Sequence, residues 1–313
     1  VTQAPYPIIS YKQAMLEFGT DKPDLRNPLR IIDVTEFFQR CTFKPFKGRT
    51  VRAIKVNRQM SKGFHEKLLK FAQSIGMGGL GYLEVMEDMS YKGPIDKFIP
   101  DDMKVEMKEL AGLSAGDTIF FIADKEARAN LYAGQIRTEL GEKLDLIEKN
   151  AYRFCYINDF PMFEYNVEEK KIGFTHNPFS MPQGGLEALN EKDPLEILAY
   201  QYDIVCNGVE LSSGAVRNHD MQIMEKAFEI AGYDKSVLEE KFGALYNAFQ
   251  FGAPPHAGMA PGVDRMIMLL RNEENIREVI PFPMSGTAQD LMCGAPNEVT
   301  EQQLREVHIK VRQ

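Results

Sequence analysis

The sequence predicts an α+β fold, and three observations point to it. Residues 62–75 place apolar side chains at the spacing of one helical face, whereas residues 50–56 and 81–85 are short runs typical of strands. The pair Asn207-Gly208 lies between two further strand-like runs and indicates a tight hairpin, because both residues tolerate positive φ. Helices and strands are therefore expected along the whole chain.

The first predicted element is a helix within residues 8–18. Ser10 is a candidate N-cap, apolar residues with helical spacing follow it, and Gly19 marks the expected end. Residues 19–28 are polar and contain two prolines, which favour extended backbone just before them. This stretch is predicted to be a junction between domains.

Residues 31–123 are predicted to form a compact α+β unit. Strands are expected at 50–56, 81–85 and 117–123, and a helix at 62–75 joins the first two. The apolar faces of the helix and of the sheet are expected to pack against each other.

The rest of the chain begins with a predicted helix at 127–144 and then becomes rich in strands. In order, the pattern predicts strands at 154–157, 163–167 and 172–175, a helix near 194–199, a hairpin over 202–217, a helix over 237–250, and a loop over 251–265 that leads into a buried helix. These elements suit a second folded region.

The composition is that of an ordinary soluble globular protein. The 313 residues are 44% hydrophobic and 26% charged, which allows a sizeable core and two domains. No apolar run approaches the ~18 residues of a membrane helix. The start, Val1-Thr2-Gln3, has no initiator Met and no signal-peptide pattern, so we expect a truncated or processed beginning. A net charge of -8 excludes binding of nucleic acid by bulk charge, but a local basic face remains compatible with an RNA partner.

The four cysteines are Cys41, Cys155, Cys206 and Cys293, and they are far apart in the sequence. Because no Cys-x-x-Cys pair occurs, neither a zinc site nor a disulfide framework is predicted. A cytoplasmic location fits this pattern best.

Residues 76–81 satisfy the G-x-G-x-x-G pattern of dinucleotide-binding folds. That mechanism needs a strand before the glycines and a helix after them, so that phosphate meets the helix N-terminus. Here a predicted helix comes first and a predicted strand follows. We therefore interpret the glycines as a helix-to-strand turn.

The candidate chemistry lies between residues 176 and 265. His176 ends a predicted strand before a proline-containing loop, where it serves either a ligand or a local hydrogen bond. In the predicted hairpin, Asp203, Glu210 and Arg217 occur among apolar and small residues. Carboxylates on half-buried strands need a partner, and two of them suit Mg²⁺ with substrate phosphates, whereas the planar guanidinium suits a carboxylate. A structural ion pair is the alternative.

A third stretch, residues 251–265, contains glycines, prolines and His256 before a predicted helix whose first turn bears Arg265. A helix start with an arginine and with glycines that permit close approach suits a polyphosphate. A structural pair between Asp264 and Arg265 is the alternative interpretation.

Several long motifs in a fixed order resemble those of bacterial-type aspartyl-tRNA synthetases, and the resemblance covers essentially the whole chain. Gly262-Val263-Asp264-Arg265 is similar to motif 3 of class II synthetases, and the segment 252–258 to the stretch before it in the aspartyl branch. Asn207 through Arg217 resembles the substrate and metal hairpin, and His176-Asn177-Pro178-Phe179 the aspartate loop. The segment 19–26 resembles the junction before the GAD insertion of bacterial enzymes.

The resemblance implies an antiparallel sheet flanked by helices, here incomplete, with an inserted α+β GAD domain. It assigns residues 1–30 and 124–313 to the catalytic domain and 31–123 to the insertion. It also implies activation of L-aspartate by ATP to aspartyl-adenylate, transfer to tRNA(Asp), and a homodimeric parent enzyme.

The resemblance further implies residue roles. Arg217 would bind the side-chain carboxylate of aspartate, and His176 would help to close its pocket. Glu210, with Asp203, would bind ATP through Mg²⁺. Motif 3 would bind ATP, with Arg265 on the terminal phosphate and Gly262, Val263 and Asp264 beside it.

Some family features are not found. The sequence shows no anticodon-binding barrel, no motif 1, and no motif 2 with its Phe-Arg-Asp-Glu string, so we expect this chain alone to be inactive or weakly active. Ser212 and Ser213 replace expected glycines, and Asn177 replaces a second histidine of many relatives.

Three alternatives remain open at this point. In a non-catalytic relative, residues 31–123 would contact tRNA or protein, but the intact ligand motifs disfavour this. In an enzyme that activates an amino acid without tRNA, the bacterial-type insertion would be unexpected. A purely structural fragment is the third alternative. The sequence also leaves open whether the parent enzyme charges tRNA(Asn), and whether the chain self-associates.

Overall fold

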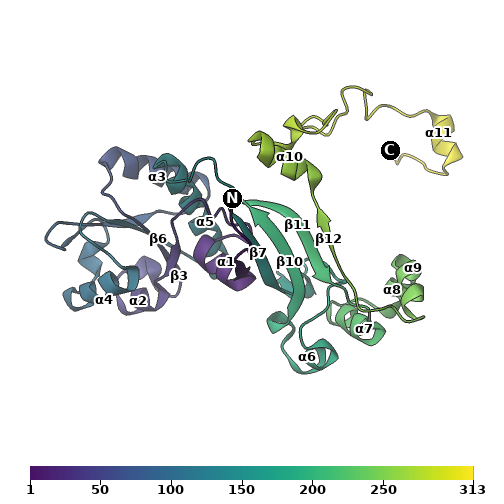
Figure 1. Cartoon of the computed structure of the whole chain (residues 1–313), viewed down its shortest axis with the longest axis horizontal. Helices are drawn as coiled ribbons and strands as arrows, with labels where there is room; N and C mark the ends of the chain where they lie inside the picture. Colours follow the sequence, from purple (N-terminus) through teal and green to yellow (C-terminus); the bar gives the residue numbers. More distant parts are fainter. Residues whose placement is uncertain (313) are drawn as a thin grey trace. The chain divides into compact units, whose positions relative to one another are not determined.

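A computed structural model describes residues 1–312 (Figure 1). The chain divides into two compact units, Val1–Pro261 and Gly262–Gln313, and each is described by itself. The first unit contains two five-stranded sheets with helices packed against them. The α+β class predicted from the sequence is therefore correct.

The sheet that carries the candidate site has the strand order β1-β7-β10-β11-β12. Strand β1 pairs with β7 in parallel, and the other neighbours are antiparallel. The strands are β1 (Ile8–Ser10), β7 (Phe154–Pro161), β10 (Leu198–Cys206), β11 (Val209–Val216) and β12 (Ala257–Pro261). The first strand thus joins a sheet whose other members come from the second half of this unit.

Helix α1 (Tyr11–Phe18) packs on this sheet through Phe18. The Ser10 side chain accepts a hydrogen bond from the Gln13 amide at 3.2 Å, so the predicted N-cap is confirmed. Gly19 has a φ of 70° and its amide donates to Met15, which ends the helix in a left-handed cap.

The second sheet has the order β2-β3-β6-β4-β5 and is antiparallel throughout. Its strands are β2 (Ile31–Asp33), β3 (Thr50–Val56), β4 (Gly81–Val85), β5 (Tyr91–Lys92) and β6 (Thr118–Asp124). Helices α2 (Thr35–Arg40) and α4 (Asp101–Ala111) pack on one face, and α3 (Lys62–Ser74) and α5 (Glu126–Lys143) on the other (Figure 1). The strands predicted at 50–56 and 81–85 are confirmed.

The connector, residues 19–30, runs between the two sheets and is held by α5. Arg137 of α5 is only 2% exposed and donates to the carbonyls of Asp24, Asn27 and Leu29 at 2.8–2.9 Å. Burial, followed by the charge of Arg30, lowers the pKa of Arg137 to about 10. Three neutral carbonyls therefore solvate one buried cation and fix the path of the connector.

The connector and α5 approach closely where Gly19 meets Gly134. A Cβ atom added to Gly134 would lie 2.7 Å from the carbonyl oxygen of Gly19. The two backbones therefore touch only because both positions lack a side chain.

The remaining elements of the first unit surround the end of the first sheet. They are the hairpin β8 (Phe163–Asn166) and β9 (Lys171–Phe174), followed by α6 (Gly185–Glu191), α7 (Met221–Ile230), α8 (Lys235–Lys241) and α9 (Gly243–Phe249). The second unit contains α10 (Val263–Arg271) and α11 (Glu301–Glu306).

Three predicted elements differ from the structure. The helix expected near 194–199 is a single 3-10 turn, Pro194–Glu196, followed by β10, whose residues alternate between buried and exposed sides. The helix expected over 237–250 is interrupted at Phe242, where φ is -124°. The loop expected over 251–265 contains β12, which pairs with β11.

Candidate functional site

The hairpin β10–β11 positions two of the predicted carboxylates. Its turn is Asn207-Gly208, with φ of 51° and 82°, which confirms the predicted hairpin. Asp203 lies opposite Ser213, and the register shifts between Ile204 and Val205, so Glu210 comes opposite Val205. The shift sets Glu210 near the end of the hairpin that meets the connector.

Asp203 is a buried carboxylate, only 3% exposed. Burial raises its pKa to about 6; the Ser213 side chain acts to lower the pKa, and the negative charge of Glu210 raises it further. Within residues 1–312 its Oδ1 atom has no hydrogen-bond partner. A buried carboxylate oxygen without a hydrogen-bond partner is suited to bind an added cation such as a metal ion.

Lys22 of the connector lies beside these carboxylates. Its Nζ atom is 2.6 Å from Oδ2 of Asp21 and 3.5 Å from Oε2 of Glu210. Burial acts to lower the pKa of Lys22, but the hydrogen bond and charge of Asp21, followed by the charge of Glu210, outweigh burial and raise the pKa. The ammonium therefore stays charged inside an acidic cluster.

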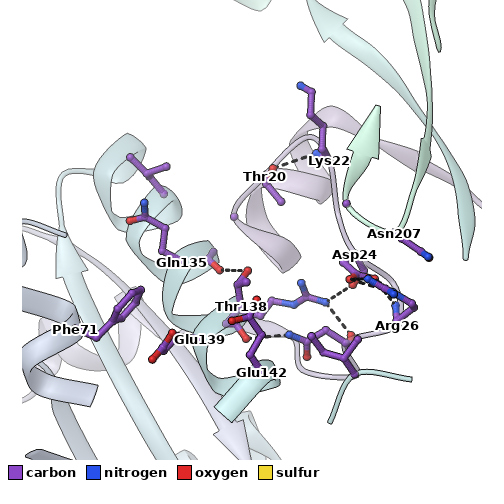
Figure 2. Close-up of a pocket in the computed structure, with 17 residues that line it drawn as sticks. Thr20, Lys22, Asp24, Arg26, Phe71, Gln135, Thr138, Glu139, Glu142 and Asn207 are labelled. Carbon is purple, nitrogen blue, oxygen red and sulfur yellow. Dashed lines mark hydrogen bonds and ion pairs between the residues drawn. The ribbon is translucent and has the colours of Figure 1, made fainter. Parts of the chain in front are cut away.

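The connector is in turn enclosed by α5 and by the hairpin turn. A cavity of about 680 Å³ lies there, lined by Lys22, Gln135 and Asn207 among others. Figure 2 shows Asp24 and Arg26 of the connector between Thr138 of α5 and Asn207 of the turn. The position of Lys22 thus depends on elements from both sheets.

His176 follows β9 and lies in the same region. Its ring packs edge-on against Phe160 of β7, with centroids 5.2 Å apart. Burial lowers its pKa, and the charges of Asp21 and Lys22 act on it in opposite directions. The predicted aspartate-loop histidine therefore packs on β7 with one side of its ring, is otherwise exposed, and lies close to the connector charges.

Arg217 directly follows β11. Its amide donates to the carbonyl of His256 at 2.9 Å, and it forms an isolated bridge with Ser180. A Cβ atom on Gly258 of β12 would lie 3.6 Å from Nη2 of Arg217, so the guanidinium lies over a strand without a side chain. Among the described residues no carboxylate lies within ion-pair distance of this guanidinium, which leaves it available for an acidic ligand.

The motif 3 residues lie in the second unit. Gly262 is the N-cap of α10, and Val263, Asp264 and Arg265 form its first turn, as the sequence predicts. The helix is not buried as expected: Leu270 is 71% exposed, and only Met268 is buried in the helix. The second unit is small and provides few apolar partners for this helix.

The carboxylates fit Mg²⁺ better than a transition metal. Across residues 1–312 no group of three or more His, Cys, Asp or Glu side chains gathers for a metal. Mg²⁺ commonly uses one or two carboxylates and completes its shell with water and phosphate oxygens. The unpartnered oxygen of Asp203, with Glu210 close by, matches that donor set.

Asp21 and Lys22 were not among the predicted site residues. Their segment was interpreted as a junction, because two prolines and several polar residues occur there. Nothing in local spacing indicates that the connector returns to a hairpin near residue 207. The one feature of the sequence that could have indicated a site here is the adjacent pair of opposite charges in a loop, Asp21 and Lys22.

Other sequence inferences can be judged from the structure. The glycine stretch 76–81 follows α3 and precedes β4, with Gly76 at a φ of 98°, which confirms a helix-to-strand turn. All four cysteines are unpaired. None of the helices among residues 1–312 is long and apolar enough to cross a bilayer.

Comparisons with known proteins identify the family. The model of class II tRNA synthetases (D, K and N) matches residues 1–286. The Aspartate--tRNA(Asp/Asn) ligase of Zymomonas mobilis is 54% identical and aligns with 99% of this chain and 53% of its own length.

Two further relatives agree. The Aspartate--tRNA(Asp/Asn) ligase of Ehrlichia canis is 52% identical over 98% of this chain, and the Aspartate--tRNA ligase of Streptomyces avermitilis is 50% identical over 99%. The chain spans about half the length of the curated relatives it matches, 53% in each of these cases. The chain belongs to the class II tRNA synthetases of the aspartate, lysine and asparagine group.

Proposed function

We propose that the protein containing this chain is an aspartate-tRNA ligase, which activates L-aspartate with ATP and transfers it to tRNA. One observation carries the proposal: the hairpin β10–β11 bears two carboxylates, and its second strand is followed directly by Arg217, which has no carboxylate at ion-pair distance among the described residues. The names of relatives that are 50–54% identical support the choice of aspartate.

Arg217 would bind the side-chain carboxylate of aspartate. A planar guanidinium forms two parallel hydrogen bonds with a carboxylate, and an amide ligand in place of that carboxylate would lose the charge attraction. The exposed ring of His176, packed on one side against Phe160, would close the pocket. Both residues are held from behind, Arg217 through its backbone bridge to Ser180 and His176 by packing on Phe160.

Glu210 and Asp203 would hold Mg²⁺ together with ATP. The bound ion would neutralise charge on the phosphates. Lys22 would keep the two carboxylates from repelling each other before ATP arrives. Arg265, with Gly262, Val263 and Asp264 at the start of α10, would bind the terminal phosphate.

The first step needs no general acid or base from the protein. The α-carboxylate of aspartate attacks the α-phosphorus of ATP, a carboxylate oxygen to phosphorus bond forms, and pyrophosphate leaves. Positioning and charge neutralisation supply the acceleration. The side chains named above contribute to both.

The proposal extends to partners and organisation. The RNA substrate is tRNA(Asp), with tRNA(Asn) as the second candidate, and the complete protein is a cytoplasmic homodimer. Residues 31–123 form the insertion, whereas 1–30 and 124–313 belong to the catalytic domain. The insertion boundaries match the limits of the second sheet, which begins with β2 and ends with β6.

Ligand binding by the 313-residue chain tests the proposal directly. Titration calorimetry should detect L-aspartate, and Arg217→Met should weaken it by about tenfold or more, since a charge-assisted bidentate pair is lost. Arg217→Lys should retain only part of the affinity. Binding of L-asparagine equal to that of L-aspartate, or unchanged aspartate affinity in Arg217→Met, would contradict the assignment.

A further inference from the structure

The charges of the second sheet and its helices are distributed unevenly. Residues 44–74, which include β3 and α3, contain nine lysines and arginines and one acidic residue. Residues 84–109, which include β5 and most of α4, contain eight acidic residues and four basic ones. Since α3 and α4 pack on opposite faces of the sheet, the asymmetry is spatial as well as sequential.

A cavity of about 330 Å³ lies where the basic segment meets the connector. Its polar lining consists of Arg30, Lys55, Asn57 and Arg58, and its apolar lining includes Val56. No carboxylate lines it among the described residues. Three cations and one amide therefore face a space that no acidic side chain shares.

Two of the cations are fixed by neutral groups. The guanidinium of Arg30 donates to the carbonyl of Leu29 at 3.0 Å, and its nearest carboxylate, Glu17, is 3.9 Å away. The ammonium of Lys55 donates to the carbonyl of Gly112 at 2.7 Å, and Oδ2 of the buried Asp117 is 3.9 Å away. The carbonyl contacts hold both side chains in place, and each cation has a carboxylate only at the limit of ion-pair distance, which compensates its charge weakly.

Arg58 is the third cation and is exposed. Its backbone is fixed, because its carbonyl accepts a hydrogen bond from the Thr118 hydroxyl at 2.8 Å. Within residues 1–312 its guanidinium makes no ion pair or hydrogen bond. A guanidinium on an anchored backbone, beside two fixed cations, is arranged to receive an anion.

We propose that this cavity binds a backbone phosphate of the tRNA substrate. The inference rests on the proposed function for its choice of RNA. Arginine, lysine and asparagine side chains are common phosphate contacts, and such contacts position a nucleic acid without reading its sequence. The exposed lysines of α3, Lys62, Lys67 and Lys70, add positive charge on the face of the sheet where Leu29 and Val56 pack, whereas a small anion would use only the cavity.

The chain as a whole carries a net charge of -8, so long-range attraction does not favour RNA. Binding must therefore come from a local set of cations. Release of counterions from each contacted phosphate makes such binding depend on salt, with a slope of about -0.9 per phosphate for a duplex. This slope gives the proposal a quantitative readout.

The test uses the 313-residue chain and a fluorescent tRNA(Asp) transcript, with anisotropy titrations over a range of salt concentrations. Arg58→Gln should lower the magnitude of the salt slope by about 1 and raise Kd by about eightfold at about 0.1 M salt. Arg58→Lys should restore most of the slope, because it keeps the charge. The matched control is Lys92→Gln on β5, at the opposite edge of the sheet, which should leave both values unchanged.

Equal slopes for Arg58→Gln and the wild-type chain would overturn the proposal. An equal loss of salt slope in Lys92→Gln and in Arg58→Gln would also overturn it, because the change in tRNA affinity would then reflect the net charge of the chain and not this cavity. Displacement of tRNA by millimolar inorganic phosphate, with loss of phosphate binding in Arg58→Gln, would assign the cavity to a small anion instead. Aspartate binding is measured separately, so a failure of the proposed function remains distinguishable from a failure of this surface.

Discussion

The ammonium of Lys22 lies 3.5 Å from a carboxylate oxygen of Glu210, although the two residues are far apart in the sequence. The same ammonium is hydrogen-bonded to Asp21 at 2.6 Å. A cation of the protein therefore lies where Glu210 is proposed to meet Mg²⁺. Divalent metal and lysine compete for the same negative charge.

Lys22→Met should strengthen binding of a divalent ion in the absence of nucleotide. A half-exposed ion pair contributes up to about 1 kcal/mol, so removing the competing charge should raise affinity by about fivefold. The affinity for the ion is measured by titrating Mn²⁺ and monitoring the free ion by electron paramagnetic resonance. Lys22→Arg and the exposed Lys12→Met should bind Mn²⁺ like the wild-type chain. Weaker binding by Lys22→Met would show that the lysine supports the metal site.

Asp203→Asn should stabilise the fold in a pH-dependent way. Burial raises the pKa of Asp203 from 3.8 to about 6, so its contribution to stability is fully present below pH 3.8 and is lost as pH rises through 6. Above that pH the wild-type chain should lose about 3 kcal/mol that Asp203→Asn does not lose. Urea unfolding at several pH values measures the difference. A difference that stays constant between pH 4 and pH 8 would be inconsistent with ionisation of this group.

Arg137→Met should destabilise the first unit. The substitution removes the hydrogen bonds that the guanidinium donates to the carbonyls of Asp24, Asn27 and Leu29, although Arg30 still donates to the last two. Because a hydrogen bond to a charged group contributes about 1.5–3 kcal/mol, and loss of a buried charge offsets part of this, we expect a loss of about 2–4 kcal/mol. Chemical denaturation measures it.

The control for Arg137 is on the same helix. Arg128 is exposed and pairs with Asp124, so Arg128→Met should change the free energy of unfolding by no more than about 0.5 kcal/mol. If both variants unfold at the same urea concentration, Arg137 does not hold the connector.

Gly134→Ala and Gly63→Ala should have effects of opposite sign. Both glycines are helical, and alanine is intrinsically favoured in a helix by about 1 kcal/mol. At Gly134 the new Cβ would lie 2.7 Å from the Gly19 oxygen, which should destabilise by about 1–3 kcal/mol. At Gly63 nothing lies within 4 Å. The unfolding temperature should fall for Gly134→Ala and rise for Gly63→Ala. A rise in both variants would mean that the connector can move away from α5.

Elements whose signals are local could be predicted from the sequence. The cap at Ser10, the turn at Asn207-Gly208 and strand β3 depend on residues within a few positions of each other. The supposed helix near 194–199 failed because Leu195, Leu198 and Ala199 happen to have helical spacing, whereas pairing with β7 determines their conformation. Helix α7 was not predicted, although Asp220 caps it. Its start follows directly on the hairpin 202–217, whose charged residues were interpreted as a ligand site.

The candidate site was predictable in part for the same reason. Asp203 and Glu210 lie on the two strands of one hairpin near its turn, which keeps them close in space, whereas Arg217 follows the far end of β11. Lys22 joins them only through the fold, because Arg137 and the glycine contact direct the connector toward the hairpin turn. Proximity that is created by tertiary packing leaves no periodic trace in a sequence.

The parallel pairing of β1 with β7 also bears on how the chain is made. Thr2 donates to the carbonyl of Tyr152, 150 residues further along, so the N-terminal segment leaves the ribosome long before its partner exists. At synthesis rates of about 5–20 residues per second the delay is roughly 7 to 30 seconds. The second sheet, with its strands between Ile31 and Asp124, is complete within that interval and can fold first. During translation it would form before the first sheet does, and α1 would pack on that sheet only once β7 has been made.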